Sequence, residues 1–242
     1  MPGTSSTISS TATSELRLAG APLRLRVDRR ARRLRLRVDV SGGGLMLTIP
    51  AGTSRRRALE WAETHGAWAE RALGALPARQ MLGPGSIVPL FGRAHLVDWD
   101  ARRPRRIERD GDRLLAGGPL EGLEARLLRW LRAEALRLLS AETAEFAAVL
   151  GSKVKRVGVG DPRSRWGSCS SAGAIRYSWR LIMAPEHVRR ATVAHEVAHL
   201  AHMNHGPRFH ALVERLLGSD PGPARAWLRR EGAALHRIGG LA

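Results

Sequence analysis

The sequence predicts an α+β fold in which an N-terminal antiparallel β meander is followed by a mostly helical region. Two patterns support this prediction. From Leu23 to Pro50, apolar and charged residues alternate with a period of two, which is typical of strands with one solvated face. From Leu120 to Leu150, leucine and alanine recur at intervals of three and four residues, as on the apolar stripe of a helix.

These patterns divide the chain into three expected regions. Residues 1–20 include a run of serine and threonine and are expected to form a disordered tail. Residues 21–118 are expected to form a β-rich region with one helix. Residues 119–242 are expected to form a mostly helical region, and this region carries the side chains with the clearest chemistry.

The first strands and a helix open the β-rich region. Arginine alternates with leucine or valine over 23–27 and 33–38, and an apolar run spans 45–49 after three glycines. The period then changes to three and four from Thr53 to Leu73, which predicts a helix with Ser54 as its N-cap.

Short strands complete this region. Period-two patterns predict strands near 87–91, 95–99, 105–108 and 113–116. The pair Asp110-Gly111 predicts a tight turn between the last two strands.

In the helical region, glycine and proline mark the expected ends of elements. Gly151 is expected to end the long helix. Strands are expected over 154–159 and 175–182. Three further helices are expected to begin at Pro185, at Pro207 and at Pro221 or Pro223, and to end near residues 202, 217 and 237.

The composition narrows the class of protein. The chain carries 40 basic and 22 acidic residues, for a formal charge of +18, and all but two of the basic residues are arginine. A polyanionic partner such as nucleic acid and a genome-wide arginine bias both account for this charge, and composition does not separate them. No apolar run is long enough to span a membrane, no secretory-signal pattern is present, and Cys169 has no second cysteine to pair with. A cytoplasmic location is the default expectation.

The strongest chemical signal is the pattern His195-Glu196-Val197-Ala198-His199, an H-E-x-x-H motif. Residues four apart on a helix share a face, so the two imidazoles can bind one metal ion. Glu196 is rotated by about 100° from His195, which allows it to contact a water molecule beside the ion. Glu196 is therefore the candidate general base.

A third histidine follows the motif. His205 reaches the same ion only if the helix ends before it, and Asn204, Gly206 and Pro207 predict such a break. Three imidazoles with one position left for water are typical of a catalytic zinc site. The expected Zn²⁺ ligands are His195, His199 and His205.

Other side chains compete with these assignments. Glu214 and, after it, Glu231 are the carboxylate alternatives to His205 as third ligand. His202 lies too far along the helix from His195 to bind the same ion. We expect it to be a surface residue or, at most, to contact one of the metal ligands. His210, on the next helix, either contacts a ligand from outside or is exposed, and exposure is the first expectation.

Several segments together resemble a known family. The segments are Asn204-His205-Gly206-Pro207-x-Phe209 after the motif and, upstream of it, Arg165–Ser170, Ile175-Arg176 and Trp179–Ile182. They are similar to segments of the YgjP-like metal-dependent hydrolases, a family of predicted zinc metallopeptidases. The resemblance extends from about Leu23 to Leu217. A more distant resemblance connects the chain to the SprT-like proteases, which act on DNA-bound proteins.

The resemblance implies a zincin-like metallopeptidase domain, with three histidines on zinc and Glu196 activating water. In such folds a strand along the cleft pairs with an extended substrate, and residues 175–182 are expected to be that strand. Arg176 and Tyr177 are the expected substrate-binding residues, and for Tyr177 an oxyanion donor and a packing residue both stay open. The chain departs from the family pattern at Tyr177-Ser178 and at His210. The segment 165–170 is either a cleft wall or a structural turn.

The first functional hypothesis is therefore a zinc-dependent metallopeptidase that cleaves peptide bonds with metal-activated water. The second is a nucleic-acid-associated protein, either an SprT-like protease or a binding module, that uses the arginine-rich strands. The third is a zinc hydrolase of a non-peptide amide or ester. A peptide or protein is the expected substrate, no membrane association is expected, and the sequence does not predict the oligomeric state.

Overall fold

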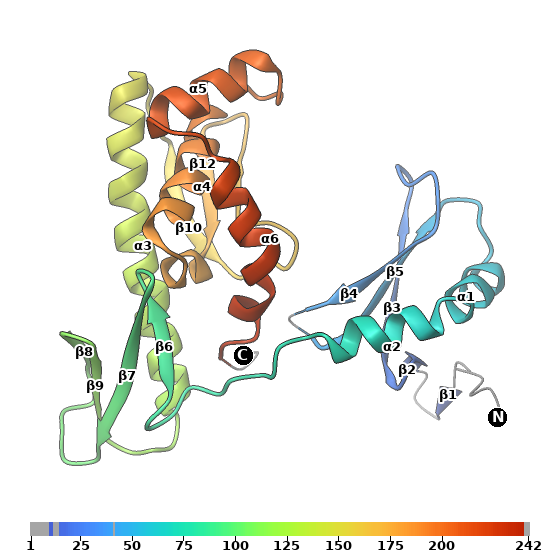
Figure 1. The fold of residues 1–242 in the computed structure, drawn as a ribbon, viewed down its shortest axis with the longest axis horizontal. Helices are drawn as coiled ribbons and strands as arrows, with labels where there is room; N and C mark the ends of the chain where they lie inside the picture. The colour runs from blue at the N-terminus through green and yellow to red at the C-terminus, as the bar shows by residue number, and fades with distance from the viewer. Residues whose placement is uncertain (1–9, 12–14, 41, 240–242) are drawn as a thin grey trace. The chain divides into compact units, whose positions relative to one another are not determined.

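The computed structural model describes residues 10–11, 15–40 and 42–239, which form two compact units that meet in the sequence between Ala78 and Arg79 (Figure 1). This division lies well before the boundary expected at residue 118. The strands over 87–117 belong to the second unit because their buried side chains, such as Val97 and Leu114, share one hydrophobic core with Leu127 of the long helix.

The first unit contains a five-stranded sheet with the strand order β1-β2-β3-β5-β4. The strands are β1 (Ser10–Thr11), β2 (Glu15–Leu18), β3 (Ala21–Asp28), β4 (Arg35–Asp39) and β5 (Gly44–Pro50). The sheet differs from a simple antiparallel meander in one respect: β5 lies between β3 and β4 and is parallel to β3, whereas the other neighbouring pairs are antiparallel. An interior place suits β5 because Leu45, Leu47 and Ile49 make it the most deeply buried strand.

The expectation of a disordered tail over 1–20 is wrong for residues 10–11 and 15–20, which the structure describes. Residues 15–18 form β2, and Leu18 is completely buried in the core of the first unit. Residues 1–9 and 12–14 of the expected tail lie outside the described residues.

The single helix expected over 53–73 is two helices, α1 (Arg55–Glu63) and α2 (Gly66–Gly74). The Ser54 hydroxyl accepts a hydrogen bond from the Arg57 amide at 3.3 Å, as expected of an N-cap. The Thr64 hydroxyl donates to the Trp61 carbonyl at 2.7 Å, which satisfies a carbonyl at the end of α1 and allows the chain to break there.

The second unit begins with a four-stranded sheet of order β6-β7-β9-β8, and a long helix follows. The elements are β6 (Ile87–Leu90), β7 (Arg93–Asp100), β8 (Ile107–Asp110), β9 (Arg113–Gly117) and α3 (Leu123–Leu150). The expected turn at Asp110-Gly111 joins β8 to β9, and Gly151 ends α3 with a left-handed φ of 68°. Both expectations are confirmed.

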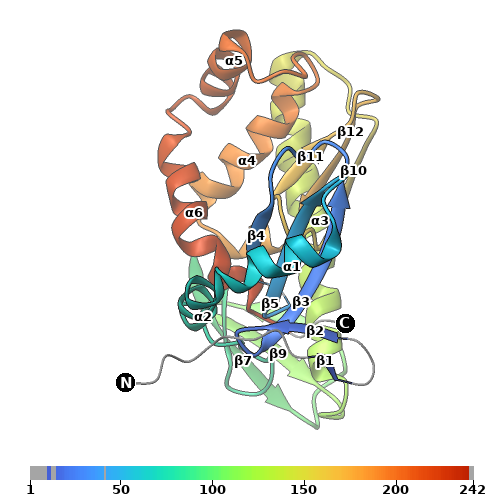
Figure 2. The same cartoon turned by 90° about the vertical axis from the view of Figure 1, so that its right-hand side faces the viewer.

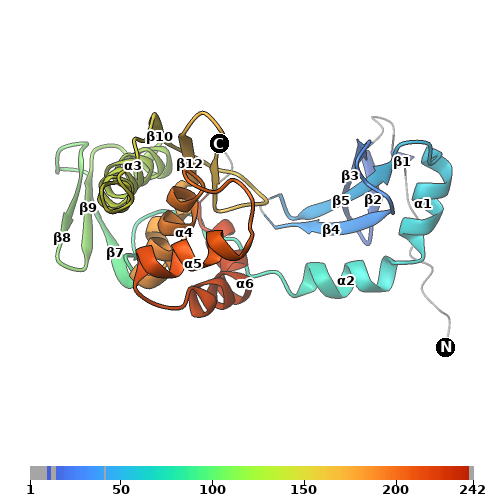
Figure 3. The same ribbon diagram turned by 90° about the horizontal axis from the view of Figure 1, so that it is seen from above.

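A three-stranded sheet and three helices complete this unit. The sheet has the order β10-β12-β11, with β10 (Arg156–Gly160), β11 (Gly167–Cys169) and β12 (Ala174–Ser178). The helices are α4 (Glu186–Ala198), α5 (Pro207–Leu217) and α6 (Gly222–His236). Helix α4 packs between β11 and α6, and α4, α5 and α6 gather on one side of α3 (Figures 2 and 3).

The strand expected over 175–182 is shorter than predicted. It ends at Ser178, and Trp179–Met183 form a 3-10 helix. The Ser178 hydroxyl accepts the Arg180 amide at 3.3 Å and caps this turn. Among the described residues, no helix has the length and apolar character needed to cross a membrane.

Candidate metal centre

Three histidines of the second unit each bring one ring nitrogen to a common point. The Nε2 atoms of His195 and His205 are 3.1 Å apart, and the candidate ligand nitrogens of these two and of His199 all lie within 4.8 Å of one another. Two nitrogens bound at about 2.05 Å to a tetrahedral ion lie about 3.3 Å apart. The three rings therefore fit one small divalent cation after only small rotations.

The end of α4 and the turn after it place these side chains. His195 and His199 are one helical turn apart, and α4 ends at Ala198, slightly earlier than expected. The chain then turns and brings His205 back before α5 begins at Pro207. The predicted break in the helix is confirmed.

The backbone of this turn differs from the expectation at Asn204. Asn204 is not among the described residues with positive φ, so a left-handed residue does not make the break. Gly206 has extended backbone, with a ψ of −179°, directly before the proline that opens α5. The break therefore depends on the extended approach to that proline, which cannot continue a preceding helix.

His202 contacts a candidate ligand from outside the cluster, as the sequence allowed, but it does so through its backbone and not through its ring. Its backbone carbonyl lies 3.1 Å from Nδ1 of His199. A carbonyl only accepts hydrogen bonds, so Nδ1 of His199 carries the proton and Nε2 is left free as a metal ligand. The turn after α4 thus selects the tautomer of the His199 ring.

The ring of Phe209 packs against all three imidazole rings. Its ring centroid lies 4.9 Å from that of His195 and 4.6 Å from those of His199 and His205, and the side chain is 1% exposed. These contacts limit the rotation of each imidazole. In the sequence Phe209 is visible as the last residue of the segment 204–209 that resembles the family, but its contact with the three rings is not.

The competing side chains do not join the cluster. Within the described residues the group that can hold a metal consists of the three histidines, without His202, His210, Glu214 or Glu231. The ring centroid of His210 lies 6.4 Å from that of His205, and the side chain of His210 is exposed.

Glu196 is buried beside this cluster, with 6% of its surface exposed. Burial raises the pKa of its carboxyl to about 7, although the charge of Arg165 acts in the opposite direction. Burial and the neighbouring imidazoles, first His199 and then His205, lower the pKa of His195 to about 4. At neutral pH His195 is therefore uncharged and can donate its lone pair to a metal.

Gly167 of β11 makes room for the Glu196 carboxylate. A Cβ atom on Gly167 would lie 2.5 Å from Oε1 of Glu196 and 2.7 Å from its Cδ, which no real pair of atoms tolerates. The polar segment 165–170 is therefore a wall of the site, at least at this residue, and not only a structural turn. The sequence showed the segment but not which of its residues faces the carboxylate.

Tyr177 is not at the site. Its side chain is completely buried, its hydroxyl lies 2.9 Å from the Thr143 hydroxyl, and burial raises its pKa well above the usual value. The role of oxyanion donor expected as one alternative is wrong, because no substrate can reach this atom. Tyr177 is a packing residue.

The strand that carries Arg176 and Tyr177 does not border the cleft either. β12 is the central strand of its sheet and pairs with β10 on one side and β11 on the other, so it has no free edge for a substrate. Arg176 is exposed and lies over Gly160, where a Cβ would be 2.7 Å from its guanidinium, and it lines a different pocket from Glu196. The free edge nearest α4 belongs to β11.

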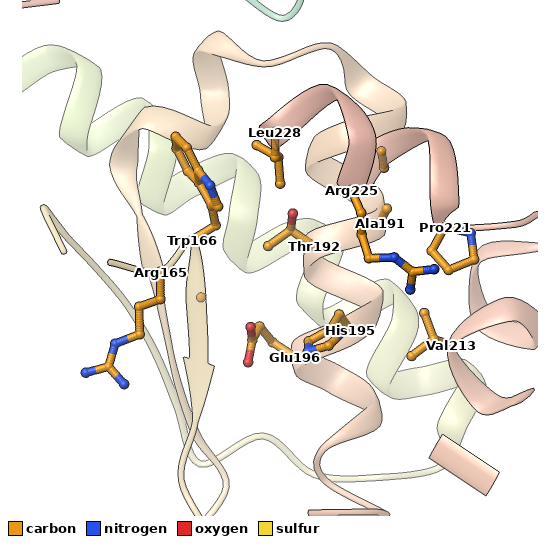
Figure 4. Close-up of a pocket in the computed structure, with 12 residues that line it drawn as sticks. Arg165, Trp166, Ala191, Thr192, His195, Glu196, Val213, Pro221, Arg225 and Leu228 are labelled. Atoms are coloured by element: carbon orange, nitrogen blue, oxygen red, sulfur yellow. The ribbon is translucent and has the colours of Figure 1, made fainter. Parts of the chain in front are cut away.

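A pocket of about 270 Å³ opens beside the cluster, and His195 and Glu196 form part of its wall (Figure 4). The opposite walls come from the segment before β11 and from α6. The buried carboxylate, the three imidazoles and this pocket thus lie together, as expected of a hydrolytic site.

The fold and the three-histidine cluster define the class of protein: an α+β domain with a candidate metal centre on an H-E-x-x-H helix. Residues 32–231 match the family model described as YgjP-like, metallopeptidase domain, and the chain therefore belongs to the YgjP-like family. At the level of this family it is a metal-dependent peptidase, with a peptide or protein as substrate. No curated protein and no solved structure matches the chain.

Proposed function

We propose that this protein is a zinc-dependent metallopeptidase that hydrolyses peptide bonds with Glu196 as general base. The observation that carries the proposal is the convergence of three imidazole nitrogens beside a buried carboxylate at the wall of a pocket. Imidazole nitrogens suit Zn²⁺, and three protein ligands are the number found in catalytic zinc sites, whereas structural sites use four.

The chain supplies the ligands and the proton acceptor. His195, His199 and His205 would hold the ion. A divalent ion there would polarise the substrate carbonyl and acidify a water molecule. The Glu196 carboxylate, which has no hydrogen-bond partner among the described residues, accepts a proton from the attacking water and passes it to the leaving amine.

We assign the pairing of an extended substrate to β11 in place of the strand expected from the sequence. β11 is an edge strand, packs against α4 and contains Gly167 next to Glu196. A peptide that added to this edge would lie alongside the general base.

Two variants test the roles of the base and of a ligand. Glu196→Gln should retain the metal and lose hydrolysis of casein, because the amide accepts no proton. His205→Ala should lose most of its metal by elemental analysis, whereas His210→Ala, the matched exposed neighbour, should retain both metal and activity. Wild-type turnover in Glu196→Gln, or wild-type metal content in His205→Ala, contradicts the assignment.

The first unit favours a second function, the binding of nucleic acid through its sheet. In the register of the sheet Arg24 and Arg37 both lie opposite Met46, and Arg26 and Arg35 both lie opposite Thr48. The four arginines therefore project from one face of β3 and β4 in a two-by-two array, and all four are exposed.

The segment that carries these strands has a larger excess of arginine over acidic residues than the chain as a whole. Residues 17–37 contain nine arginines and one acidic residue, whereas the whole chain has 40 basic residues against 22 acidic ones. In the array, the guanidinium of Arg26 lies 3.3 Å from the Asp28 carboxylate, and that of Arg24 lies 3.8 Å from the Asp39 carboxylate. The other two arginines of the array have no carboxylate within ion-pair distance among the described residues. We propose that the array contacts the phosphate backbone.

A salt titration with a 20-base-pair DNA duplex tests this second function. Each phosphate contact contributes about 0.9 to the slope of log K against log salt, so replacing the four array arginines by glutamine should reduce the slope by about 3.6. Four exposed helix arginines, Arg55, Arg56, Arg57 and Arg71, supply a control variant of equal charge. Equal loss of affinity in both variants contradicts a specific role for the sheet.

A further inference from the structure

The pocket beside Glu196 has apolar walls. Trp166, Ala191, Val213 and Leu228 line it together with the two residues of the motif. Its volume of about 270 Å³ leaves room for one leucine or phenylalanine side chain. The only polar lining group on α4 outside the motif, the Thr192 hydroxyl, donates to the Val188 carbonyl at 3.0 Å and is thereby satisfied.

The indole of Trp166 is fixed as one wall. Its ring centroid lies 4.9 Å from that of His236, and a Cβ on Gly232 would lie 2.8 Å from its ring. Gly232 therefore allows the indole to lie directly against α6. Because two residues of α6 contact the indole, this wall is preformed, as binding pockets for small apolar groups usually are.

Two arginines line the same pocket, and neither forms an ion pair with a carboxylate of the described residues. Within the described residues, Arg165 and Arg225 make no ion pair or hydrogen bond, and Glu196 is the one acidic side chain in the lining. In Figure 4 the Arg225 side chain extends towards Pro221 and Val213, which also line the pocket, whereas the guanidinium of Arg165 points away from it. Arg225 is thus the cation available to a group bound inside.

We propose that this pocket is a substrate subsite, in which an apolar side chain packs against Trp166 and Leu228 while Arg225 binds a carboxylate of the substrate. The inference rests on the proposed function in one respect, since it takes the ligand to be a peptide. In a peptide the carboxylate is either the C-terminal one or that of an acidic side chain. A guanidinium binds either through charge-assisted, bidentate hydrogen bonds.

Binding of small probes to the full-length protein tests the subsite without any need for turnover. Ligand-observed NMR titrations compare N-acetyl-leucine, its amide, N-acetyl-glycine and N-acetyl-glutamate amide. The proteins are the wild type, Arg225→Gln and Arg229→Gln, which removes an exposed arginine of α6 outside the pocket. Because all three share the same metal site, binding of a carboxylate to a metal cannot produce a difference between them.

The proposal predicts that N-acetyl-leucine binds the wild type at least tenfold more tightly than its amide or N-acetyl-glycine does. Arg225→Gln should abolish the difference between acid and amide, and Arg229→Gln should leave it unchanged. Stronger Arg225-dependent binding of N-acetyl-glutamate amide would assign the carboxylate to an acidic side chain, and stronger binding of N-acetyl-leucine to the C-terminus. Equal affinities of wild type and Arg225→Gln, or of the leucine and glycine probes, overturn the subsite, whether or not the protein cleaves peptides.

Discussion

Gly167→Ala tests whether the close approach of β11 to Glu196 positions the general base. The added Cβ would lie 2.5 Å from Oε1 of Glu196, and an ordinary contact between these atoms needs about 3.4 Å. The carboxylate must therefore move by about 0.9 Å. Gly167 itself is not among the described glycines with positive φ, so alanine is compatible with its backbone.

A displacement of this size predicts a large kinetic effect. A misplacement of about 1 Å at a reacting group costs on the order of a hundredfold in rate, which equals about 2.7 kcal/mol of activation free energy. The three atoms nearest to the new methyl group all belong to Glu196, so the metal content should stay at the wild-type value. The expected result is a kcat about a hundredfold lower at unchanged metal content.

The assay measures kcat on a peptide substrate, metal content and thermal unfolding for three proteins. Gly158→Ala is the matched control, because Gly158 lies in the same sheet and a Cβ there meets nothing within 4 Å. It should retain wild-type kcat. Wild-type kcat in Gly167→Ala would refute the reasoning, and an equal loss in both variants would show that the sheet, and not the carboxylate, is affected.

Three further predictions concern the supports of the site. Phe209→Ala should lower the free energy of unfolding by about 3–5 kcal/mol in urea titrations and weaken metal binding, since the buried ring contacts all three histidines; unchanged metal affinity would refute that support. Glu142→Ala should cost about 3–5 kcal/mol because it leaves the buried Arg189 unpaired, whereas Glu145→Ala, which breaks the exposed pair with Arg190, should cost under about 1 kcal/mol; similar values for both would be the contrary result. Burial raises the pKa of Asp161, but hydrogen bonds from Arg180 at 2.8 Å and 3.1 Å lower it to a net value below the usual range. Ionised Asp161 therefore stabilises the fold fully above the unfolded pKa of about 3.9, and this contribution is lost as the pH falls through the lower folded value. The melting temperatures of wild type and Asp161→Asn should accordingly differ at pH 7 and converge in acid, and a constant difference would contradict the assignment.

The chemistry of the site was accessible from the sequence because its main parts are local. The spacing of His195 and His199 follows from the helical repeat, and the proline at 207 predicts the break that returns His205. Other local signals were equally reliable, such as the N-cap at Ser54 and the glycine stop after α3. Each depends on a few neighbouring residues.

Non-local pairing was not accessible. Period two in β3, β4 and β5 predicts strands, but the insertion of β5 between the other two depends on which strand buries most apolar surface. For the same reason the sequence predicted that residues 175–182 would pair with the substrate, whereas β12 is the central strand of its sheet and has no free edge. Alternation describes the two faces of a strand and not which neighbour lies at each edge.

The contacts that adjust the site were also invisible in the linear pattern. Three such contacts are those of Gly167 with Glu196, of Phe209 with the histidine rings and of the His202 carbonyl with His199. The residue types alone do not indicate these partners. The residue type does not show whether a tyrosine is buried or exposed, so the sequence did not predict that Tyr177 lies in the core.

The sequence by itself determined the helix that carries the motif, the three nitrogen donors and the acid beside them, because helical periodicity and proline sterics act over a few residues. Only the tertiary structure decided which strand borders the carboxylate, which side chains enclose the pocket and where the chain divides into two units. These depend on packing between segments that are distant in the sequence, and packing selects among partners that local patterns leave equivalent.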